Sequence, residues 1–169
     1  MNHDNHDMHH VAPKDSPKEY AKFAAVLTLV GAGAYILTQL TDTSAMFAVM
    51  GVFLVTFAGF KLINLKEFAF GFQSYDLIAK KSLSYSYAYP FIQLVLGVLY
   101  ISGIANVYVH VLSLVVALVS SVGVLNSLMK KQAVHCVCLG NVIKLPLSRI
   151  SFVEDFGMAI MALIMIINR

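Results

Sequence analysis

The stretch of sequence that decides the fold is residues 82–129, SLSYSYAYPFIQLVLGVLYISGIANVYVHVLSLVVALVSSVGVLNSLM, which contains no Asp, Glu, Lys or Arg. As a single helix rising 1.5 Å per residue it would be about 70 Å long, more than twice the roughly 30 Å hydrocarbon core of a bilayer. We therefore expect the stretch to fold back at residues 102–106, which contain Gly103. This predicts membrane spans near residues 89–101 and 107–128, with Pro90 at the start of the first.

Two further uncharged runs, residues 23–41 and 43–60, precede this stretch. Hydrophobic residues make up 59% of the 169-residue chain and charged residues only 12%, whereas soluble domains carry about 25% charged residues. The sequence therefore predicts an all-α, polytopic membrane bundle with further helices at residues 17–40 and 45–63. No segment combines the basic clustering and solubility that nucleic-acid binding needs, and no hydrolase or kinase motif is present.

The remaining segments are more polar. Residues 64–88 alternate charged and aromatic side chains, which predicts an interfacial amphipathic helix, followed by an aromatic belt of Tyr85, Tyr87 and Tyr89. Ser151 and Glu154 are spaced as a capping box, so we expect the last helix to run from 151 to 167, with Glu154 and Asp155 in its first turn.

Three kinds of polar or soft side chain lie within the predicted spans. Gln93 is expected to make an interhelical hydrogen bond, and His110 to meet water or a backbone carbonyl near a helix end. Met46 and Met50 share one helix face and Met158, Met161 and Met165 share another. Methionine is an ordinary core filler, so we interpret both faces as apolar packing, although thioethers can also pass Cu(I) through a bundle.

Orientation follows from the placement of lysine and arginine. Eleven of the twelve basic residues fall on one side if all five long helices span, and only Arg169 falls on the other. The positive-inside rule then predicts that the N-terminal tail and the loop after residue 129 are both cytoplasmic.

Both cysteines of the chain lie in that loop, as His135-Cys136-Val137-Cys138. Two sulfur ligands at this spacing can share one thiophilic metal ion or close as a strained, easily reduced disulfide. On a reducing cytoplasmic face a bound soft ion such as Cu(I) is the expected resting state. Nearby lysines would favour the thiolate under either interpretation.

The N-terminal tail, residues 1–15, is too polar to build a core and is expected to be disordered without a ligand. It concentrates potential metal ligands: His3, His6, His9 and His10, with two methionines and two aspartates. His3 is third from a free amine and could complete a square-planar chelate for Cu(II) or Ni(II). The tail is therefore predicted to bind metal.

Several motifs resemble the MauE-like, DoxX-related family of membrane proteins. They are Phe-Ala-Gly-Phe-Lys-Leu at residues 57–62, the aromatic segment 72–77, Pro-Phe-Ile-Gln at 90–93 and the Cys-x-Cys-Leu-Gly loop. The resemblance covers roughly residues 45–167 and implies a four-helix core, an extra first helix and thiol chemistry. Gln93 stands where the family has an acidic residue, Leu139 where phenylalanine is usual, and Glu154-Asp155 in place of an Arg-Asn pair.

Three functions are left open by these observations, and whether the chain is an enzyme is open with them. The favoured function is handling of a soft metal, with copper as Cu(I) the expected ion, captured by the tail and held by Cys136, Cys138 and His135. The second is a thiol–disulfide redox protein in which Cys136 and Cys138 cycle while assisting maturation of a partner, as the family resemblance implies. The third is a non-catalytic assembly subunit. The partners are then the lipid bilayer of a bacterial inner membrane and a metal-transport or redox protein.

Overall fold

The computed structural model describes residues 17–41, 43–73, 76, 78–129 and 147–168. Its elements are α1 (Pro17–Thr41), α2 (Ala45–Ile63), the short α3 (Leu65–Gln73), α4 (Leu83–Ile101), α5 (Val107–Met129) and α6 (Leu147–Ile167). Within the described ranges the regular secondary structure is all helical and contains no strand, as predicted.

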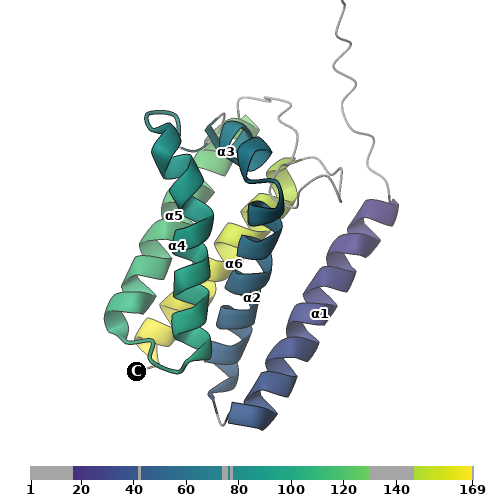
Figure 1. Ribbon diagram of the computed structural model, residues 1–169, viewed down its shortest axis with the longest axis vertical. Coiled ribbons are helices and arrows are strands. Elements are labelled where there is room, and N and C mark those ends of the chain that lie inside the picture. The colour runs from purple at the N-terminus through teal and green to yellow at the C-terminus, as the bar shows by residue number, and fades with distance from the viewer. Residues whose placement is uncertain (1–16, 42, 74–75, 77, 130–146, 169) are drawn as a thin grey trace, which may run out of the picture.

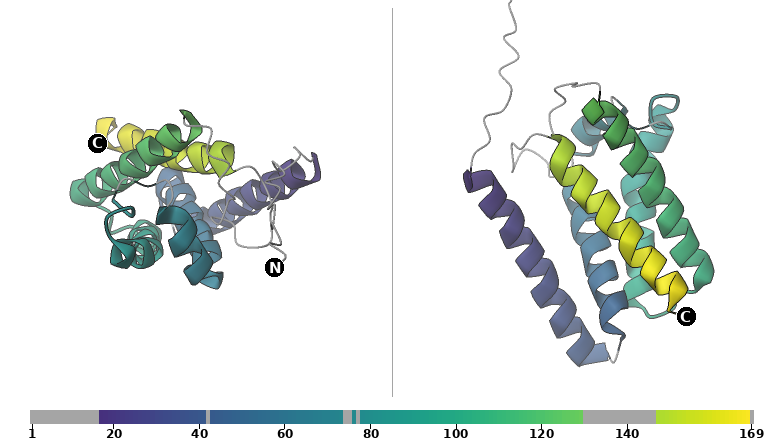
Figure 2. Two further views of the ribbon diagram at one scale, coloured as in Figure 1. Left: turned by 90° about the horizontal axis from the view of Figure 1, so that it is seen from above. Right: turned by 180° about the vertical axis from the view of Figure 1, so that it is seen from behind.

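The five long helices alternate in direction along the bundle (Figure 1). One end, here called the α3 end, carries the start of α1, the end of α2, α3, the start of α4, the end of α5 and the start of α6. The opposite end carries the α1–α2 and α4–α5 connections and the end of α6. Helix α1 packs against α2 and leans away from the other long helices towards its own start (Figure 2).

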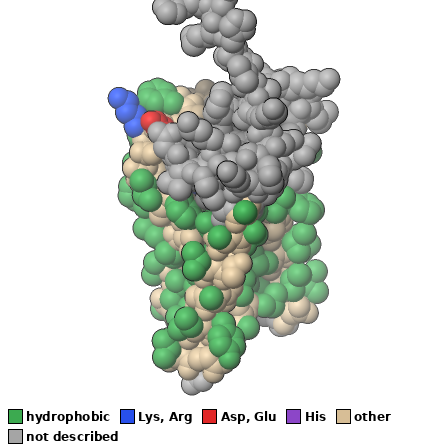
Figure 3. All heavy atoms as spheres, turned by 90° about the vertical axis from the view of Figure 1, so that its right-hand side faces the viewer, with side chains coloured by type: hydrophobic (Ala, Val, Ile, Leu, Met, Phe, Trp, Pro, Cys, Tyr) green, Lys and Arg blue, Asp and Glu red, His purple; other side chains and the backbone are tan. Residues whose placement is uncertain are grey.

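Three helices in the described part are long and apolar enough to cross a membrane, over residues 23–41 of α1, Ala45–Ile63 and 107–126 of α5. Helices α4 and α6 have similar lengths, but α4 opens with serines and tyrosines and α6 contains Glu154 and Asp155. Large apolar side chains such as Leu29, Leu40 and Tyr108 are exposed, as expected for surfaces that contact lipid. Hydrophobic side chains are spread over the lower part of the face in Figure 3, and the charged side chains visible among the described residues lie at its upper left.

Helices α2 and α4 approach each other closely at a pair of glycines. A Cβ atom added to Gly51 would lie 2.9 Å from the backbone nitrogen of Ile101, and one added to Gly97 would lie 3.0 Å from that of Val55. Small residues allow such backbone contact between membrane helices, where dispersion between closely packed atoms drives association. Around this crossing, Met50, Phe57, Met158 and Met165 are buried in the core, consistent with the packing role predicted for the methionines.

The fold-back predicted in the uncharged stretch is confirmed. Helix α4 ends at Ile101, Gly103 has a φ of +68° and its N–H donates to the carbonyl of Tyr100. A left-handed residue after a helix is commonly glycine, because other side chains are strained there. Asn106 then caps α5, its Oδ1 accepting from the N–H of Val109 at 3.2 Å.

Three predicted boundaries are wrong. The amphipathic segment 64–88 is helical as α3 only to Gln73, and α4 begins at Leu83, so Pro90 lies inside that helix. Tyr89 is 1% exposed and belongs to the interior, which removes it from the predicted aromatic belt. Helix α6 begins at Leu147, so Ser151 and Glu154 are inside the helix and do not form a capping box.

The connection between α3 and α4 is organised by Asp76. Its Oδ1 accepts hydrogen bonds from the backbone N–H groups of Ile78 and Ala79, at 2.9 and 2.8 Å. The residue is fully buried and its Oδ2 has no hydrogen-bond partner within the described ranges. Burial raises the pKa of Asp76 above its ordinary value of 3.8, against the opposing effect of the two N–H donors and Lys80.

Candidate functional site

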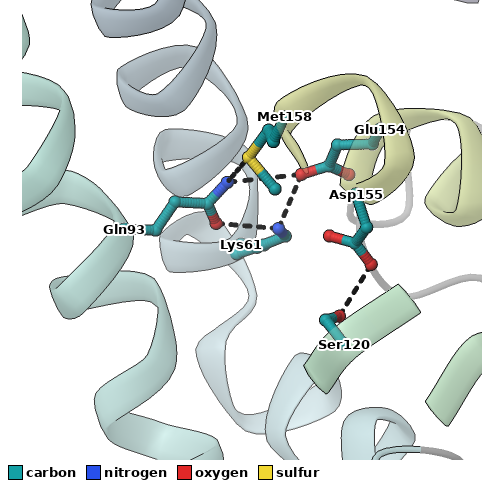
Figure 4. Close-up of polar contacts among 6 residues, drawn as sticks. All are labelled: Lys61, Gln93, Ser120, Glu154, Asp155 and Met158. Carbon is teal, nitrogen blue, oxygen red and sulfur yellow. Dashed lines mark hydrogen bonds and ion pairs between the residues drawn. The ribbon is translucent and has the colours of Figure 1, made fainter. Parts of the chain in front are cut away.

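A buried ion pair joins α2 to α6 near the α3 end of the bundle. Lys61 Nζ lies 2.8 Å from Glu154 Oε1, and the two residues are 2% and 1% exposed. The ammonium also donates to Gln93 Oε1 on α4, again at 2.8 Å (Figure 4). Ionisable groups inside a membrane bundle are costly and usually pair with one another, so a buried pair of this kind marks a candidate functional site.

Gln93 completes the contacts between the three helices. Its Nε2 donates to Glu154 Oε1 at 3.3 Å and approaches the sulfur of Met158 at 3.9 Å, while its Oε1 accepts from Lys61. This confirms the predicted interhelical hydrogen bond. One amide thus bridges an ammonium and a carboxylate, using both its acceptor and its donor.

Aromatic rings line the other side of the ammonium. Lys61 Nζ lies 5.2 Å from the ring centroid of Tyr89 and 5.8 Å from that of Phe68. Phe68 and Phe72 of α3 stack against each other and on Tyr89, which encloses the site at the α3 end. A desolvated ammonium gains about 2 kcal/mol or more from an aromatic face, which offsets part of its burial cost.

A second carboxylate lies beside the pair. Asp155 is 3% exposed, and its Oδ2 accepts a short hydrogen bond of 2.6 Å from Ser120 of α5. The Tyr89 hydroxyl is buried and has no hydrogen-bond partner within the part of the chain that the structure describes. The cluster of Lys61, Gln93, Ser120, Glu154 and Asp155, named here the polar cluster, therefore ties four helices together (Figure 4).

The polar cluster corrects several predictions. Lys61 was expected to flank a span in a loop, but it is buried. Of the eleven basic residues predicted on one side of the membrane, ten therefore remain as support for the predicted orientation. Glu154 and Asp155 were attributed to helix capping, and instead they contact Lys61 and Ser120.

Outside the polar cluster, His110 was expected to meet water or a backbone carbonyl. Its Nδ1 lies 2.9 Å from the Tyr100 hydroxyl instead.

The residues predicted to bind metal or carry thiol chemistry lie outside the described residues: His3, His6, His9, His10, His135, Cys136 and Cys138. Within the described ranges no group of three or more His, Cys, Asp or Glu side chains is arranged to hold a metal ion. Residues 130–146, which carry Cys136 and Cys138 and are called here the Cys segment, are flanked by α5 and α6. Helix α5 ends and α6 begins at the α3 end. Glu154 follows the first residue of α6 by two turns, about 10 Å along the helix axis.

Apolar helices long enough to span, with an ion pair enclosed between them, define an integral membrane protein of the polytopic α-helical class. A family model described as Methylamine utilisation protein MauE matches residues 39–168. The chain therefore belongs to the MauE family, and the match takes in α2 to α6 while leaving most of α1 outside. No curated protein and no solved structure matches the chain.

Proposed function

We propose that this membrane protein carries out thiol–disulfide exchange on a partner protein through Cys136 and Cys138. The observation that supports this function is the extent of the family match, which includes both cysteines and every helix of the four-helix core. The metal-ligand tail lies outside the match. The family resemblance implies a role in the maturation of a disulfide-rich dehydrogenase, and we extend from it only the class of partner, a protein with exchangeable cysteines.

The exchange balances without a further reactant. One thiolate attacks a sulfur of the partner's disulfide and forms a mixed disulfide, and the second thiolate displaces the partner's sulfur. The cysteine pair then holds the disulfide, having given two electrons and two protons to the partner, which gains two thiols. The reverse sequence inserts a disulfide into the partner.

The polar cluster contributes positioning. It holds the first part of α6 against α2 and α4 through Lys61, Gln93 and Glu154, two turns from the segment that carries the cysteines. A buried hydrogen-bonded network favours one helix arrangement, because a shifted helix would leave its members unpaired. The attachment point of the Cys segment is fixed accordingly.

The experiment measures the redox equilibrium of the full-length protein in nanodiscs. Mixtures of reduced and oxidised glutathione should interconvert dithiol and disulfide forms, resolved by alkylation and mass spectrometry. Cys138→Ser should trap a mixed disulfide through Cys136 with a model peptide that contains a disulfide, because no second thiolate is present to displace the peptide's sulfur. The Cys136→Ser/Cys138→Ser variant is the matched control. Absence of a disulfide form at every glutathione ratio, together with no mixed disulfide, would contradict the proposal.

A second candidate, handling of a soft metal ion, is favoured by the position of α1. Helix α1 begins at the α3 end, where α5 ends and α6 begins, so the tail and the Cys segment attach to the same end of the bundle (Figure 1). A Cu(I) ion captured by His3, His6, His9 and His10 would then be close to the thiolates of Cys136 and Cys138, with His135 beside them.

Metal titration separates the two candidates. After the four tail histidines are replaced by alanine, the reduced protein should bind a Cu(I) ion that depends on Cys136, so that Cys136→Ser binds one Cu(I) fewer per chain. Such Cys136-dependent binding without disulfide exchange would favour metal handling over the redox function. Disulfide exchange without Cys136-dependent Cu(I) binding would eliminate metal handling by the cysteines.

A further inference from the structure

A pocket at the opposite end of the bundle from the Cys segment contains soft ligand atoms. It has a volume of about 330 Å³ and lies where the start of α2, the α4–α5 connection, α5 and the end of α6 meet. Its inner wall includes Met46, His110 and Met165, of which His110 is 4% and Met165 6% exposed. Ser44, Asn106 and Asn168 are exposed at its rim. We name it the Met–His pocket.

The chemistry of the pocket selects a narrow class of ligand. Among the described residues that line it there is no Asp, Glu, Lys or Arg. The donors on its inner wall are two thioethers and one imidazole, and the side-chain oxygens of Ser44, Asn106 and Asn168 lie at the rim. Magnesium and calcium require carboxylate or carbonyl oxygens, whereas thioether sulfur prefers soft ions such as Cu(I). A neutral set of two sulfurs and one nitrogen therefore suits a monovalent soft cation.

His110 has a hydrogen-bonded arrangement suited to a ligand. Its Nδ1 lies 2.9 Å from the Tyr100 hydroxyl, whose ring stacks on the imidazole, and the ring of Phe47 lies 5.4 Å away on α2. When Nδ1 carries the proton and the Tyr100 oxygen accepts it, Nε2 presents the lone pair that a metal needs. A metal ion at Nε2 would replace any hydrogen bond that this nitrogen makes.

A groove next to the Met–His pocket is lined by a further methionine. Met46 and Met165 also line an adjoining groove of about 200 Å³ between α2 and α6, together with Met161. Three methionines from two helices thus line the pocket and the groove beside it, and His110 lines the pocket. Methionine is the most adaptable apolar side chain, so small rotamer changes can bring its sulfur to an ion.

We propose that the Met–His pocket binds a soft monovalent cation of the Cu(I) or Ag(I) class through Met46, His110 and Met165. The site is independent of the thiol function proposed above, since it lies at the other end of the bundle and uses none of its residues. Tyr100 is a positioning residue that orients the imidazole.

The test uses Ag(I), which is soft, monovalent and redox-inactive, and the full-length chain in nanodiscs. The background variant carries serine at Cys136 and Cys138 and alanine at the other predicted soft ligands, His3, His6, His9, His10 and His135. This variant should bind about one Ag(I) per chain by isothermal titration calorimetry. Met46→Leu and Met165→Leu each remove one ligand. Each variant should bind Ag(I) at least about 10- to 100-fold more weakly, which is the typical cost of losing even an outer-shell partner of a metal ligand.

Matched controls separate ligation from packing. Met50→Leu alters a fully buried methionine of α2, the helix that also carries Met46, and Met50 is not among the lining residues of the pocket. This variant should leave the affinity for Ag(I) unchanged. Tyr100→Phe should weaken Ag(I) binding about 10- to 100-fold through the imidazole. If Met165→Leu impairs folding, Met46→Leu still tests the site, because Met46 is only half-buried.

Each outcome decides the proposal. No Ag(I) binding by the background variant, equal affinity in Met46→Leu and Met50→Leu, or Zn(II) binding as tight as that of Ag(I) would overturn it. The redox titration of Cys136 and Cys138 in the wild-type protein is unaffected by these results, so failure of this site and failure of the thiol function are distinguishable.

Discussion

Replacing Lys61 by methionine should destabilise the protein strongly, because it leaves the Glu154 carboxylate buried without its ammonium. Glu154 is 1% exposed, and its remaining described hydrogen bond to Gln93 is the longer one, at 3.3 Å. Removing one partner of a buried pair typically costs about 3–5 kcal/mol, which is two to nearly four orders of magnitude in the folding equilibrium at about 1.4 kcal/mol per tenfold. That is a large share of a typical unfolding free energy of about 5–15 kcal/mol.

The double variant Lys61→Met/Glu154→Leu provides the sharper test. With both charges replaced by apolar groups of similar volume, stability should return to near the wild-type value or exceed it by about 1–4 kcal/mol. The assay is reversible unfolding in mixed micelles with increasing SDS, followed by circular dichroism. Lys66→Met, an exposed lysine five residues further on, is the control and should change stability by less than about 0.5 kcal/mol. The reasoning is refuted if Lys61→Met is as mild as Lys66→Met, or if the two single effects simply add.

Three further predictions follow from the fold. Gly97→Ala should lower the unfolding free energy by about 1–3 kcal/mol in the same assay, because its Cβ would overlap α2. Gly59→Ala, with open space around it, should raise the unfolding free energy by up to about 1 kcal/mol. Similar effects at both sites would contradict the close crossing of α2 and α4. Asp76→Asn retains the acceptor for the two backbone N–H groups. Because burial raises the pKa of Asp76, the unfolding free energy of the wild type should fall as pH rises above 3.8, and that of the variant should not. A difference between the two proteins that does not change with pH would contradict this prediction. A membrane-impermeant thiol reagent should label Cys136 and Cys138 only after cells are permeabilised, and labelling of intact cells would reverse the predicted orientation.

The helical framework was largely predictable from sequence. The bounds of α2 agree at both ends, and α5 begins at the predicted residue, 107. Both helices begin directly after turn residues and continue into long uncharged runs, and these local signals are strong because backbone polar groups in lipid must be satisfied within the helix. Helices with polar ends were predicted less well, since the Ser- and Tyr-rich start of α4 resembles an interfacial segment.

The polar cluster was not predictable in the same way. Lys61 and Glu154 are 93 residues apart and each lies near the end of an apolar run, where a lysine resembles a flanking charge and a glutamate resembles a helix cap. Periodicity and capping rules are local and cannot pair residues on different helices. A usable signal was present, however: Gln93 is a polar side chain inside an uncharged span and needs partners, and the charges nearest in depth on the other helices are those of Lys61 and Glu154.

Helix α1 changes the geometry of the whole chain by reversing its direction once before the four-helix core. Because α1 runs antiparallel to α2, residues 1–16 attach at the end where α2 finishes; attached directly to α2, they would emerge where it starts. This single additional crossing therefore decides whether residues 1–16 attach at the end where α5 finishes and α6 begins or at the end of the Met–His pocket. Gain or loss of this one helix would move the attachment point from one end of the bundle to the other without altering any residue of the core.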